Sequence, residues 1–201
     1  MITLDHLAFA YPGKGLVLED VSLRLDHGDL VCLCGPSGCG KSTTLDIVAG
    51  LRTPQRGTRQ VGSRRLGYAF QEPRLLPWRS ARDNVRIGLR GWLTAHEAAT
   101  AADEWLGRLG LAEAAATRPA QLSGGMRRRV SLARAFAVRP EILLLDEPFA
   151  FLDEDACRRV ADAIRDLHGR GVALLMVSHV RDWAEALGCR ILDIPGAPVR
   201  L

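Results

Sequence analysis

GPSGCGKS, at residues 35–42, is the stretch that decides the fold of this chain of 201 residues. It follows Leu30–Cys34, a continuous apolar run that predicts a fully buried strand, and precedes Ser42–Gly50, whose apolar residues recur at helical spacing. Glycines in such a loop let backbone N–H groups turn toward a phosphate group, and the positive end of the helix dipole favours the same anion. A merely structural glycine turn is the alternative, but the flanking strand and helix are the context that a phosphate-binding loop requires.

A second apolar run, Ile142–Leu145, ends in two acids, Asp146 and Glu147. Taken alone, such an ending is common and usually marks only the edge of a strand. Beside a phosphate-binding loop, however, the first carboxylate is placed to reach Mg²⁺ and the second to polarise a water that attacks a γ-phosphate. Lys41 would then reach the β- and γ-phosphates, and the Ser42 hydroxyl would bind Mg²⁺. Together the two stretches predict a site for a nucleoside triphosphate.

The composition is typical of a soluble globular protein, with 47% hydrophobic and 25% charged residues. No apolar run approaches the roughly 18 residues of a membrane span. Met1–Asp5 lacks the start of a secretory signal, so we expect a cytosolic location. The five cysteines show no CxxC spacing, which argues against a zinc site or a disulfide framework. The formal net charge is +4, but the 25 arginines and two lysines are scattered, so the charge says little about nucleic-acid or lipid partners.

Periodicity along the rest of the chain predicts an α/β fold. Strands are expected at residues 2–10, 21–25, 30–34, 66–70, 141–145 and 172–177, and helices at residues 42–50, 94–109, 126–138, 154–168 and 180–187. Residues 53–65 are expected to form short turns with at most one edge strand. This order of elements is typical of a parallel sheet with an inserted helical subdomain. We therefore predict one domain over residues 1–201, with a core of residues 1–71 and 141–201 and a helical subdomain of residues 72–140.

Leu122–Gly125 reads Leu-Ser-Gly-Gly and starts a helix within the predicted insert. Ser123 is a suitable N-cap, and the two glycines expose backbone amides at a second helix N-terminus that favours phosphate. With this segment the chain resembles the ATP-binding cassette (ABC) ATPases over nearly its whole length. The family's elements occur in family order, as Tyr11, the loop 35–42, Gln71, Leu122–Gly125, Asp146-Glu147-Pro148, Leu152-Asp153 and His179. A plain phosphate-loop kinase or GTPase does not explain Leu122–Gly125 together with His179.

The resemblance implies a P-loop NTPase of ABC ATPase type, with a mainly parallel core sheet, an antiparallel N-terminal β region and an inserted helical subdomain. It also implies that ATP and Mg²⁺ are bound and that ATP hydrolysis is coupled to transport. Catalysis would fall to Glu147 as the base, His179 as the γ-phosphate switch and Gln71. Ser42, Gln71 and Asp146 would bind Mg²⁺. The nucleotide would contact a larger set, with Tyr11 stacked on adenine and the phosphates held by Gly35, Pro36, Ser37, Gly38, Cys39, Gly40, Lys41, Ser42 and Thr43.

Partners also follow from the resemblance. A homodimer is implied, in which Asp153 lies at the interface and the ATP of the partner subunit is bound by Leu122, Ser123, Gly124 and Gly125. The run QEPRLLPW at residues 71–78 is similar to the subgroup that serves nitrate, sulfonate and taurine importers. In that subgroup an integral membrane permease would dock on Leu75, Leu76 and Trp78, although ordinary packing inside the subdomain is the alternative. The subunit would lie peripherally on the cytoplasmic side of the cell membrane and serve a substrate-binding protein only indirectly.

One rival function and two departures from the family pattern remain. The rival is a soluble ABC ATPase that acts on nucleic acid or ribosomes. Such proteins usually carry two cassettes or long coiled-coil inserts, so no nucleic-acid partner is expected, and Arg127–Arg129 is interpreted as a solvated helix face.

Arg128 replaces a usual glutamine, which leaves open the contacts near the nucleotide. Phe151 replaces a usual small residue, which leaves open the packing of the dimer interface. Trp92, Trp105 and Trp183 are expected to be in the core or partly covered.

Overall fold

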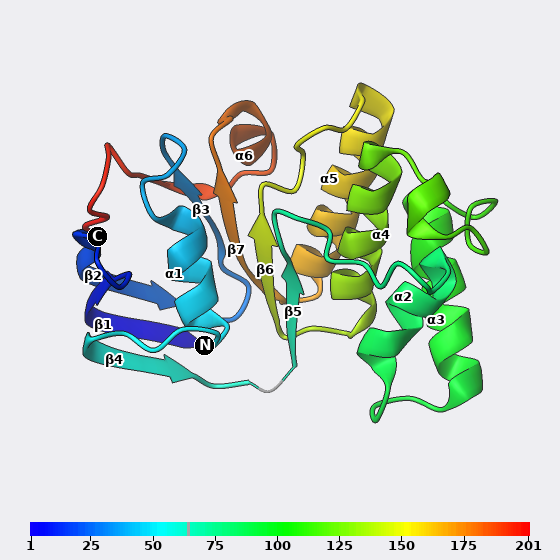
Figure 1. The fold of residues 1–201 in the computed structure, drawn as a ribbon, viewed down its shortest axis with the longest axis horizontal. Coiled ribbons are helices and arrows are strands. Elements are labelled where there is room, and N and C mark those ends of the chain that lie inside the picture. Colours follow the sequence, from blue (N-terminus) through cyan, green and yellow to red (C-terminus); the bar gives the residue numbers. More distant parts are fainter. Residues whose placement is uncertain (64) are drawn as a thin grey trace.

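Two sheets organise the computed structural model, which describes residues 1–63 and 65–201 (Figure 1). The antiparallel sheet has the order β2-β1-β4 and consists of β1 (Ile2–Ala10), β2 (Leu16–Leu25) and β4 (Arg56–Val61). The parallel sheet has the order β5-β6-β7-β3-β8 and consists of β3 (Leu30–Cys34), β5 (Leu66–Ala69), β6 (Ile142–Asp146), β7 (Ala173–Ser178) and β8 (Arg190–Asp193). The predicted fold class is confirmed.

Helices follow the strands of the parallel sheet, and those inserted between β5 and β6 gather beyond its β5 edge (Figure 1). Three of them follow strands directly, α1 (Lys41–Val48), α5 (Glu154–Gly169) and α6 (Asp182–Ala186). The segment between β5 and β6 contains α2 (Ala81–Arg86), the 3₁₀ turn η1 (Ile87–Leu89), α3 (Ala95–Arg108), the 3₁₀ turn η2 (Pro119–Gln121) and α4 (Gly124–Ala137). Helices α2, α3 and α4 pack on one another, and α4 also contacts β5.

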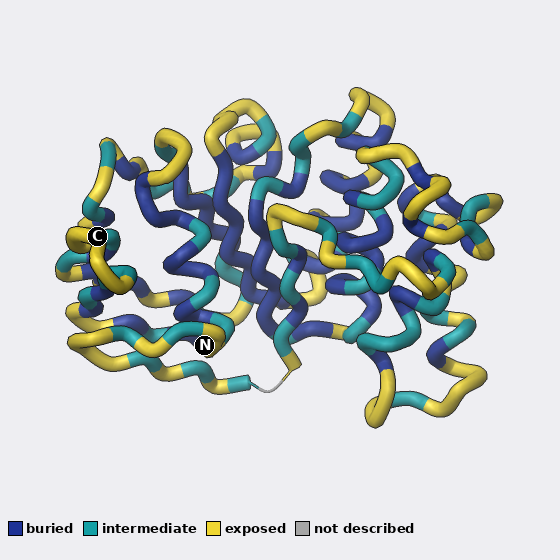
Figure 2. The backbone as a smooth tube through the Cα atoms, viewed as in Figure 1, coloured by how far each residue is buried: buried dark blue, intermediate teal, exposed yellow. Residues whose placement is uncertain are grey.

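Two apolar cores lie on the two faces of the parallel sheet. Its central strands β3, β6 and β7 are buried along their whole length (Figure 2). Because side chains alternate along a strand, Leu33 and Leu144 face the core shared with α1 and the antiparallel sheet. Cys32 and Leu143 face the core shared with the helices. Burial on both faces explains why these strands read as continuous apolar runs.

Several features lie beyond the sequence prediction, among them helix α2, which was not predicted. Strand β8 was not predicted, and neither was the pairing of Val199 with β2, in which Val199 N–H donates to Val17 O at 2.9 Å. Trp92, expected to be in the core or partly covered, lies on the turn between η1 and α3 with 57% of its surface exposed, so it is outside the core and only partly covered. Within residues 1–63 and 65–201, no helix is both long and apolar enough to cross a bilayer.

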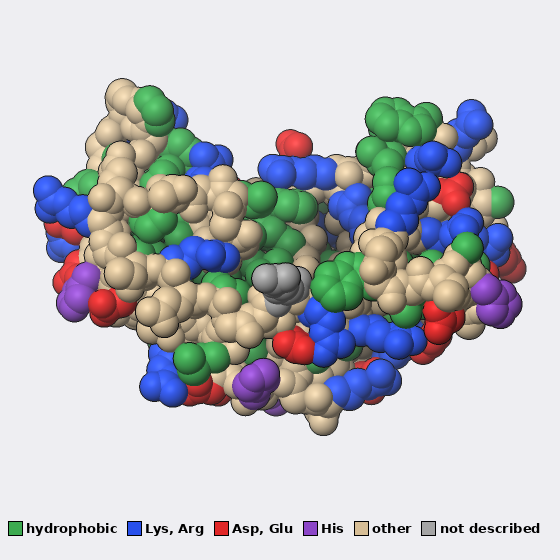
Figure 3. Space-filling view, turned by 90° about the horizontal axis from the view of Figure 1, so that it is seen from below, with side chains coloured by type: hydrophobic (Ala, Val, Ile, Leu, Met, Phe, Trp, Pro, Cys, Tyr) green, Lys and Arg blue, Asp and Glu red, His purple; other side chains and the backbone are tan. Residues whose placement is uncertain are grey.

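Charge is dispersed on the face of the molecule that Figure 3 shows. Lys and Arg side chains lie there among acidic, apolar and polar side chains and do not form one unbroken patch. Many arginines make ion pairs, such as Arg65 with Glu141 and Arg108 with Asp166.

Candidate functional site

The loop between β3 and α1 is held by its own glycines and lysine. Gly40 has φ 116°, and a Cβ atom there would lie 2.8 Å from Val17 Cγ1, so a larger residue does not fit. The Lys41 ammonium donates to the backbone carbonyls of Gly35 at 2.7 Å and Pro36 at 2.8 Å. Cys39, which belongs to the loop, is buried. These contacts close the loop around the lysine and fix its backbone before any ligand arrives.

A cavity of about 390 Å³ beside this loop brings together most of the predicted nucleotide-binding residues. Its lining combines the turn after β1, the start of β2, the loop, α1 and the segments that follow β5 and β6. The lining residues are Tyr11, Lys14, Val17, Ser37, Gly38, Gly40, Lys41, Ser42, Thr43, Gln71 and Glu147. The Tyr11 hydroxyl lies 3.1 Å from Thr43 Oγ1, which ties the aromatic ring to α1. Lys14 and Val17 were missed by the sequence analysis, where their proximity to Tyr11 was the only signal.

Asp146 lies behind this cavity at the end of β6, and its side chain is only 3% exposed. Burial raises the pKa of Asp146, while a hydrogen bond from Ser42 and the positive charge of Arg128 partly oppose that rise. Its Oδ1 has no hydrogen-bond partner among the described residues. A buried carboxylate oxygen without a partner, next to a hydroxyl, suits Mg²⁺, which binds one or two protein oxygens together with substrate phosphates.

Glu147 follows Asp146 in a strained backbone conformation. Its φ of 52° is in the left-handed region, which a non-glycine residue adopts only when its surroundings impose it. Its N–H donates to Val177 O at 3.0 Å, and its Oε2 lies 2.9 Å from His179 Nδ1. His179 directly follows β7, the neighbour of β6, and contacts Glu147 without lining the cavity. The structure therefore brings two of the three predicted catalytic residues into contact, and the third, Gln71, lines the cavity with Glu147.

The Leu-Ser-Gly-Gly segment lies at a separate place. Ser123 caps α4, because its Oγ accepts a hydrogen bond from Met126 N–H at 3.1 Å, as predicted. Gly125 permits a close approach, since a Cβ atom there would lie 3.0 Å from Phe151 O. Leu122 is buried, and Gly124 lines a second cavity with Gln71 and Phe151. None of Leu122–Gly125 lines the cavity beside the loop.

Residues 18–150 match the family described as ABC transporter. The chain belongs to the ABC transporter family. The taurine import ATP-binding protein TauB of Pseudomonas aeruginosa is 39% identical over 212 residues, which cover 100% of this chain and 81% of TauB. The aliphatic sulfonates import ATP-binding protein SsuB 2 of Burkholderia lata is 43% identical over 199 residues, which cover 94% of this chain and 71% of SsuB 2. The nitrate import ATP-binding protein NrtD of Synechococcus elongatus is 37% identical over 198 residues, which cover 92% of this chain and 72% of NrtD.

A solved structure agrees with this assignment. The ATP-binding cassette MJ0796, in a dimeric post-hydrolysis state bound to ADP and Pi, superposes with a TM-score of 0.90 at 30% identity. The match covers 97% of this chain and 94% of that one. The prediction of an ABC ATPase that is similar to the nitrate, sulfonate and taurine subgroup is thereby confirmed.

The segment predicted to dock a permease is partly exposed in this ABC ATPase. Leu75 packs against the apolar core, Leu76 is half-buried, and Trp78 is 66% exposed. Asn84, fully buried on α2, shapes the segment, since its Oδ1 accepts from Leu76 N–H at 2.7 Å and its Nδ2 donates to Ser80 O at 2.9 Å. Sequence analysis missed Asn84, although a lone amide on the apolar face of a helix is a signal for such a role.

Asp153, predicted to lie at a dimer interface, is exposed at the start of α5. Its Oδ1 accepts a hydrogen bond from Ala156 N–H at 2.8 Å, so the side chain caps the helix. The preceding Phe151 is 90% exposed and has φ 62°. A large apolar side chain is thus presented to solvent beside the segment that contains Gly125.

The interpretation of Arg127–Arg129 as a solvated helix face is wrong. Arg128 is 3% exposed, and the other two are half-buried. Each donates to backbone carbonyls, Arg127 to Leu122 O at 2.8 Å and Arg129 to Leu109 O at 2.9 Å. Loop carbonyls that pack against a helix must find donors, and long guanidinium groups reach them.

Replacing Asp146 with asparagine is expected to increase the free energy of unfolding at neutral pH. Burial raises the pKa of Asp146 above its ordinary 3.8, so the ionised carboxylate destabilises the folded state. This penalty is absent below the unfolded pKa and grows as pH rises through the higher folded pKa. Urea unfolding at several pH values should show a higher free energy of unfolding for the variant than for the native chain. This difference should shrink as pH falls. A variant less stable than the native chain at pH 7 would contradict this account.

Proposed function

We propose that this ABC ATPase is the ATP-hydrolysing subunit of a membrane importer and acts as a homodimer that closes over two Mg·ATP. The observation that carries the proposal is the separation of Leu122–Gly125 from the cavity that contains Lys41 and Glu147. A second copy related by two-fold symmetry offers its Ser123 and Gly125 to complete each site. The dimeric, ADP-bound relative supports this arrangement. Residues 1–71 and 141–201 would form the ATP-binding core and residues 72–140 the helical subdomain.

In this proposal each residue of the site has a task in hydrolysis, and the geometry of the cavity supports these tasks. Tyr11 stacks on the adenine, while Lys41 and the loop amides bind the phosphates and orient the terminal one. Ser42, Gln71 and Asp146 are the residues that would hold Mg²⁺, which when bound neutralises phosphate charge. Glu147 orients the attacking water and accepts its proton. His179 Nδ1 holds the Glu147 carboxylate by their contact of 2.9 Å.

The relatives support an importer of small anions. TauB, SsuB 2 and NrtD are named for import of taurine, aliphatic sulfonates and nitrate, and a cargo of this class follows for the present chain. The ATPase would lie on the cytoplasmic side of the cell membrane, bound to integral permease subunits that receive cargo from a substrate-binding protein. It would hydrolyse ATP without touching the cargo.

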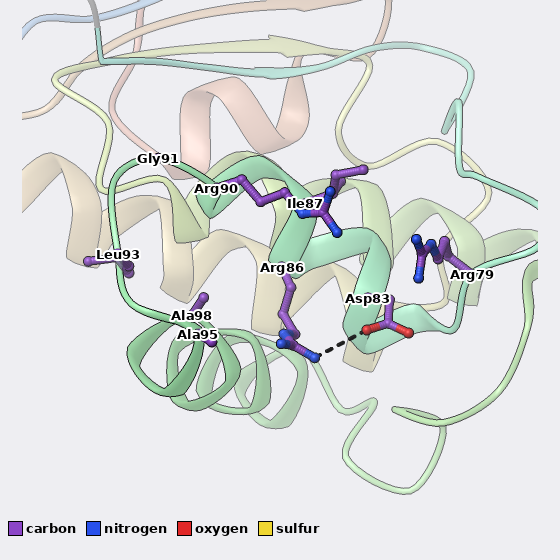
Figure 4. Close-up of a pocket in the computed structure, with 9 residues that line it drawn as sticks. All are labelled: Arg79, Asp83, Arg86, Ile87, Arg90, Gly91, Leu93, Ala95 and Ala98. Atoms are coloured by element: carbon purple, nitrogen blue, oxygen red, sulfur yellow. Dashed lines mark hydrogen bonds and ion pairs between the residues drawn. The ribbon is translucent and has the colours of Figure 1, made fainter.

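The permease would contact Leu76 and Trp78 and a neighbouring basic cavity of about 410 Å³. The cavity lies between α2, η1 and the start of α3 (Figure 4) and is lined by Arg79, Asp83, Arg86, Ile87, Arg90, Gly91, Leu93, Ala95 and Ala98. Three of these side chains are arginines and one is an acid, and only Arg86 is drawn in contact with Asp83, at 3.3 Å. Such a site favours a permease segment that combines apolar side chains with an acidic one.

The double substitution Leu76→Ala with Trp78→Ala is expected to abolish co-purification with the permease and to stop transport. Aromatic and aliphatic anchors that become buried in an interface often contribute about 2 kcal/mol or more each to binding. ATPase activity of the isolated subunit should change little, since neither side chain lines the nucleotide cavity. Leu51→Ala, which removes an apolar side chain that is 56% exposed elsewhere, is the matched control. Unfolding of the double variant, or parallel loss of ATPase activity, would show that these residues only pack the subdomain.

ATP-dependent dimerisation is the test of the homodimer. Glu147→Gln protein should be monomeric without nucleotide and dimeric in saturating Mg·ATP, because ATP that is bound but not hydrolysed keeps both sites closed. Light scattering coupled to size exclusion measures the mass in each condition. The double variant Glu147→Gln with Ser123→Arg should stay monomeric, since a long side chain there blocks the partner's ATP. A Glu147→Gln monomer in saturating Mg·ATP would overturn the homodimer.

A further inference from the structure

Arg128, the central residue of the arginine run on α4, makes contacts unlike those of its neighbours. Its guanidinium donates to four backbone carbonyl oxygens, those of Phe70, Gln71, Asp146 and Glu147. The distances to Gln71 O and Glu147 O are 3.0 Å and 2.6 Å. The acceptors belong to two segments that follow different strands, and both segments carry predicted catalytic or Mg²⁺-binding residues.

The fold explains why these carbonyls need a donor. Strands β5 and β6 are neighbours in the parallel sheet, so their carboxyl ends lie side by side. Beyond those ends the ladder stops, and buried backbone carbonyls must be satisfied from another element. Helix α4 contacts β5 and places a single arginine between the two ends. Arginine carries five N–H donors in a planar fork, whereas glutamine carries two.

The surroundings of Arg128 make this arrangement costly unless it is fully used. Burial lowers the pKa of Arg128 to about 10, against the opposing effect of the Asp146 and Glu147 charges. A buried cation is retained only where polar partners compensate for its lost hydration. The four carbonyls compensate the two terminal nitrogens and are in turn held in place by them, while the buried Nε has no hydrogen-bond partner among the described residues.

We propose that Arg128 is a positioning residue for ATP hydrolysis, which fixes the backbone of Glu147 relative to Gln71 and transmits the position of α4 to both. It holds the carbonyl of a residue whose φ of 52° requires support from outside its own segment. The Glu147 carboxylate then keeps its direction toward the cavity, where a misplacement of about 1 Å can cost about 100-fold in rate. Because Arg128 follows Ser123 on α4, movement of that helix changes the backbone of both segments at once. This role rests on the proposed function of Glu147 as the base.

Arg128→Gln in the full-length chain tests the role. It should lower the kcat of Mg·ATP hydrolysis by about 10- to 100-fold and leave KM nearly unchanged, since Arg128 does not line the nucleotide cavity. Arg134→Gln is the matched control, because Arg134 is also on α4 and donates to the backbone carbonyls of Pro73 and Arg74 at 2.8 and 2.9 Å, yet does not contact Glu147. Its kcat should equal that of the native chain.

A double-mutant cycle separates positioning of Glu147 from general support of the fold. In the Glu147→Gln background, Arg128→Gln should reduce single-turnover hydrolysis far less than in the native background, since the two changes act through one group. Equal losses of rate in both backgrounds, an unchanged kcat, or an effect on KM in place of kcat would overturn the proposal.

If Arg128→Gln does not fold, Arg128→Lys keeps the charge without the fork and should fold with lowered kcat. Failure of both variants to fold would overturn the positioning role. A native-like rate for Glu147→Gln alone would instead contradict the proposed base.

Discussion

Glutamine in place of Glu147 is expected to lower ATP turnover by about 10²- to 10⁴-fold and to leave ATP binding intact. The substitution keeps the size of the side chain and removes only its ability to accept a proton from water. Lys41, Ser42 and Tyr11 line the same cavity and are unaffected by the change. Phosphate release measures turnover, and titration with a fluorescent ATP analogue measures binding.

The same substitution at the other end of β6 provides the control for Glu147→Gln. Glu141 immediately precedes the strand and forms an ion pair with Arg65, on the edge opposite the cavity. Glu141→Gln should therefore hydrolyse ATP at the native rate. Hydrolysis at the native rate by Glu147→Gln would show that another group accepts the proton.

Local sequence was sufficient to predict which side chains meet in the cavity beside the loop. The glycines of the loop, the lysine and the two acids each follow a strand of a parallel sheet, and the carboxyl ends of such strands meet at one edge. The pattern of buried strands therefore determines that Lys41 and Glu147 approach one another, although about one hundred positions of chain separate them. Gln71 reaches the same cavity for the same reason, since β5 is the neighbour of β6.

The features that sequence did not reveal depend on neighbours distant in the chain. A run of three arginines looks the same whether it faces water or loop carbonyls, and only the packing of α4 on β5 distinguishes the two. Val199 is fully buried because it pairs with β2, a contact that no local pattern in a short tail indicates. Asn84 likewise finds its hydrogen-bond partners only when residues 76–80 fold around its amide group, which donates to Leu76 O and Ser80 O.

Alanine in place of Lys41 is expected to weaken ATP binding by about 10- to 100-fold, because hydrogen bonds to charged groups contribute about 1.5–3 kcal/mol. The Lys41 ammonium lies within the loop, held by the carbonyls of Gly35 and Pro36, at the point where the cavity meets the N-terminus of α1. Its removal takes the charge away from the phosphates and leaves two loop carbonyls without that donor. Isothermal titration with ATP and Mg²⁺ measures the loss, and calorimetric unfolding shows whether the fold is retained.

Lys14 makes the Lys41→Ala experiment decisive, because it is the only other lysine of the chain and lines the same cavity. Lys14→Ala removes the same charge from an exposed position beside Tyr11, so long-range electrostatics change by a similar amount in both variants. A much larger loss for Lys41→Ala would show that direct contact with phosphate, and not net charge, determines affinity. Equal losses would mean that the cavity attracts ATP by charge alone, and the assignment of Lys41 to the β- and γ-phosphates would then be wrong.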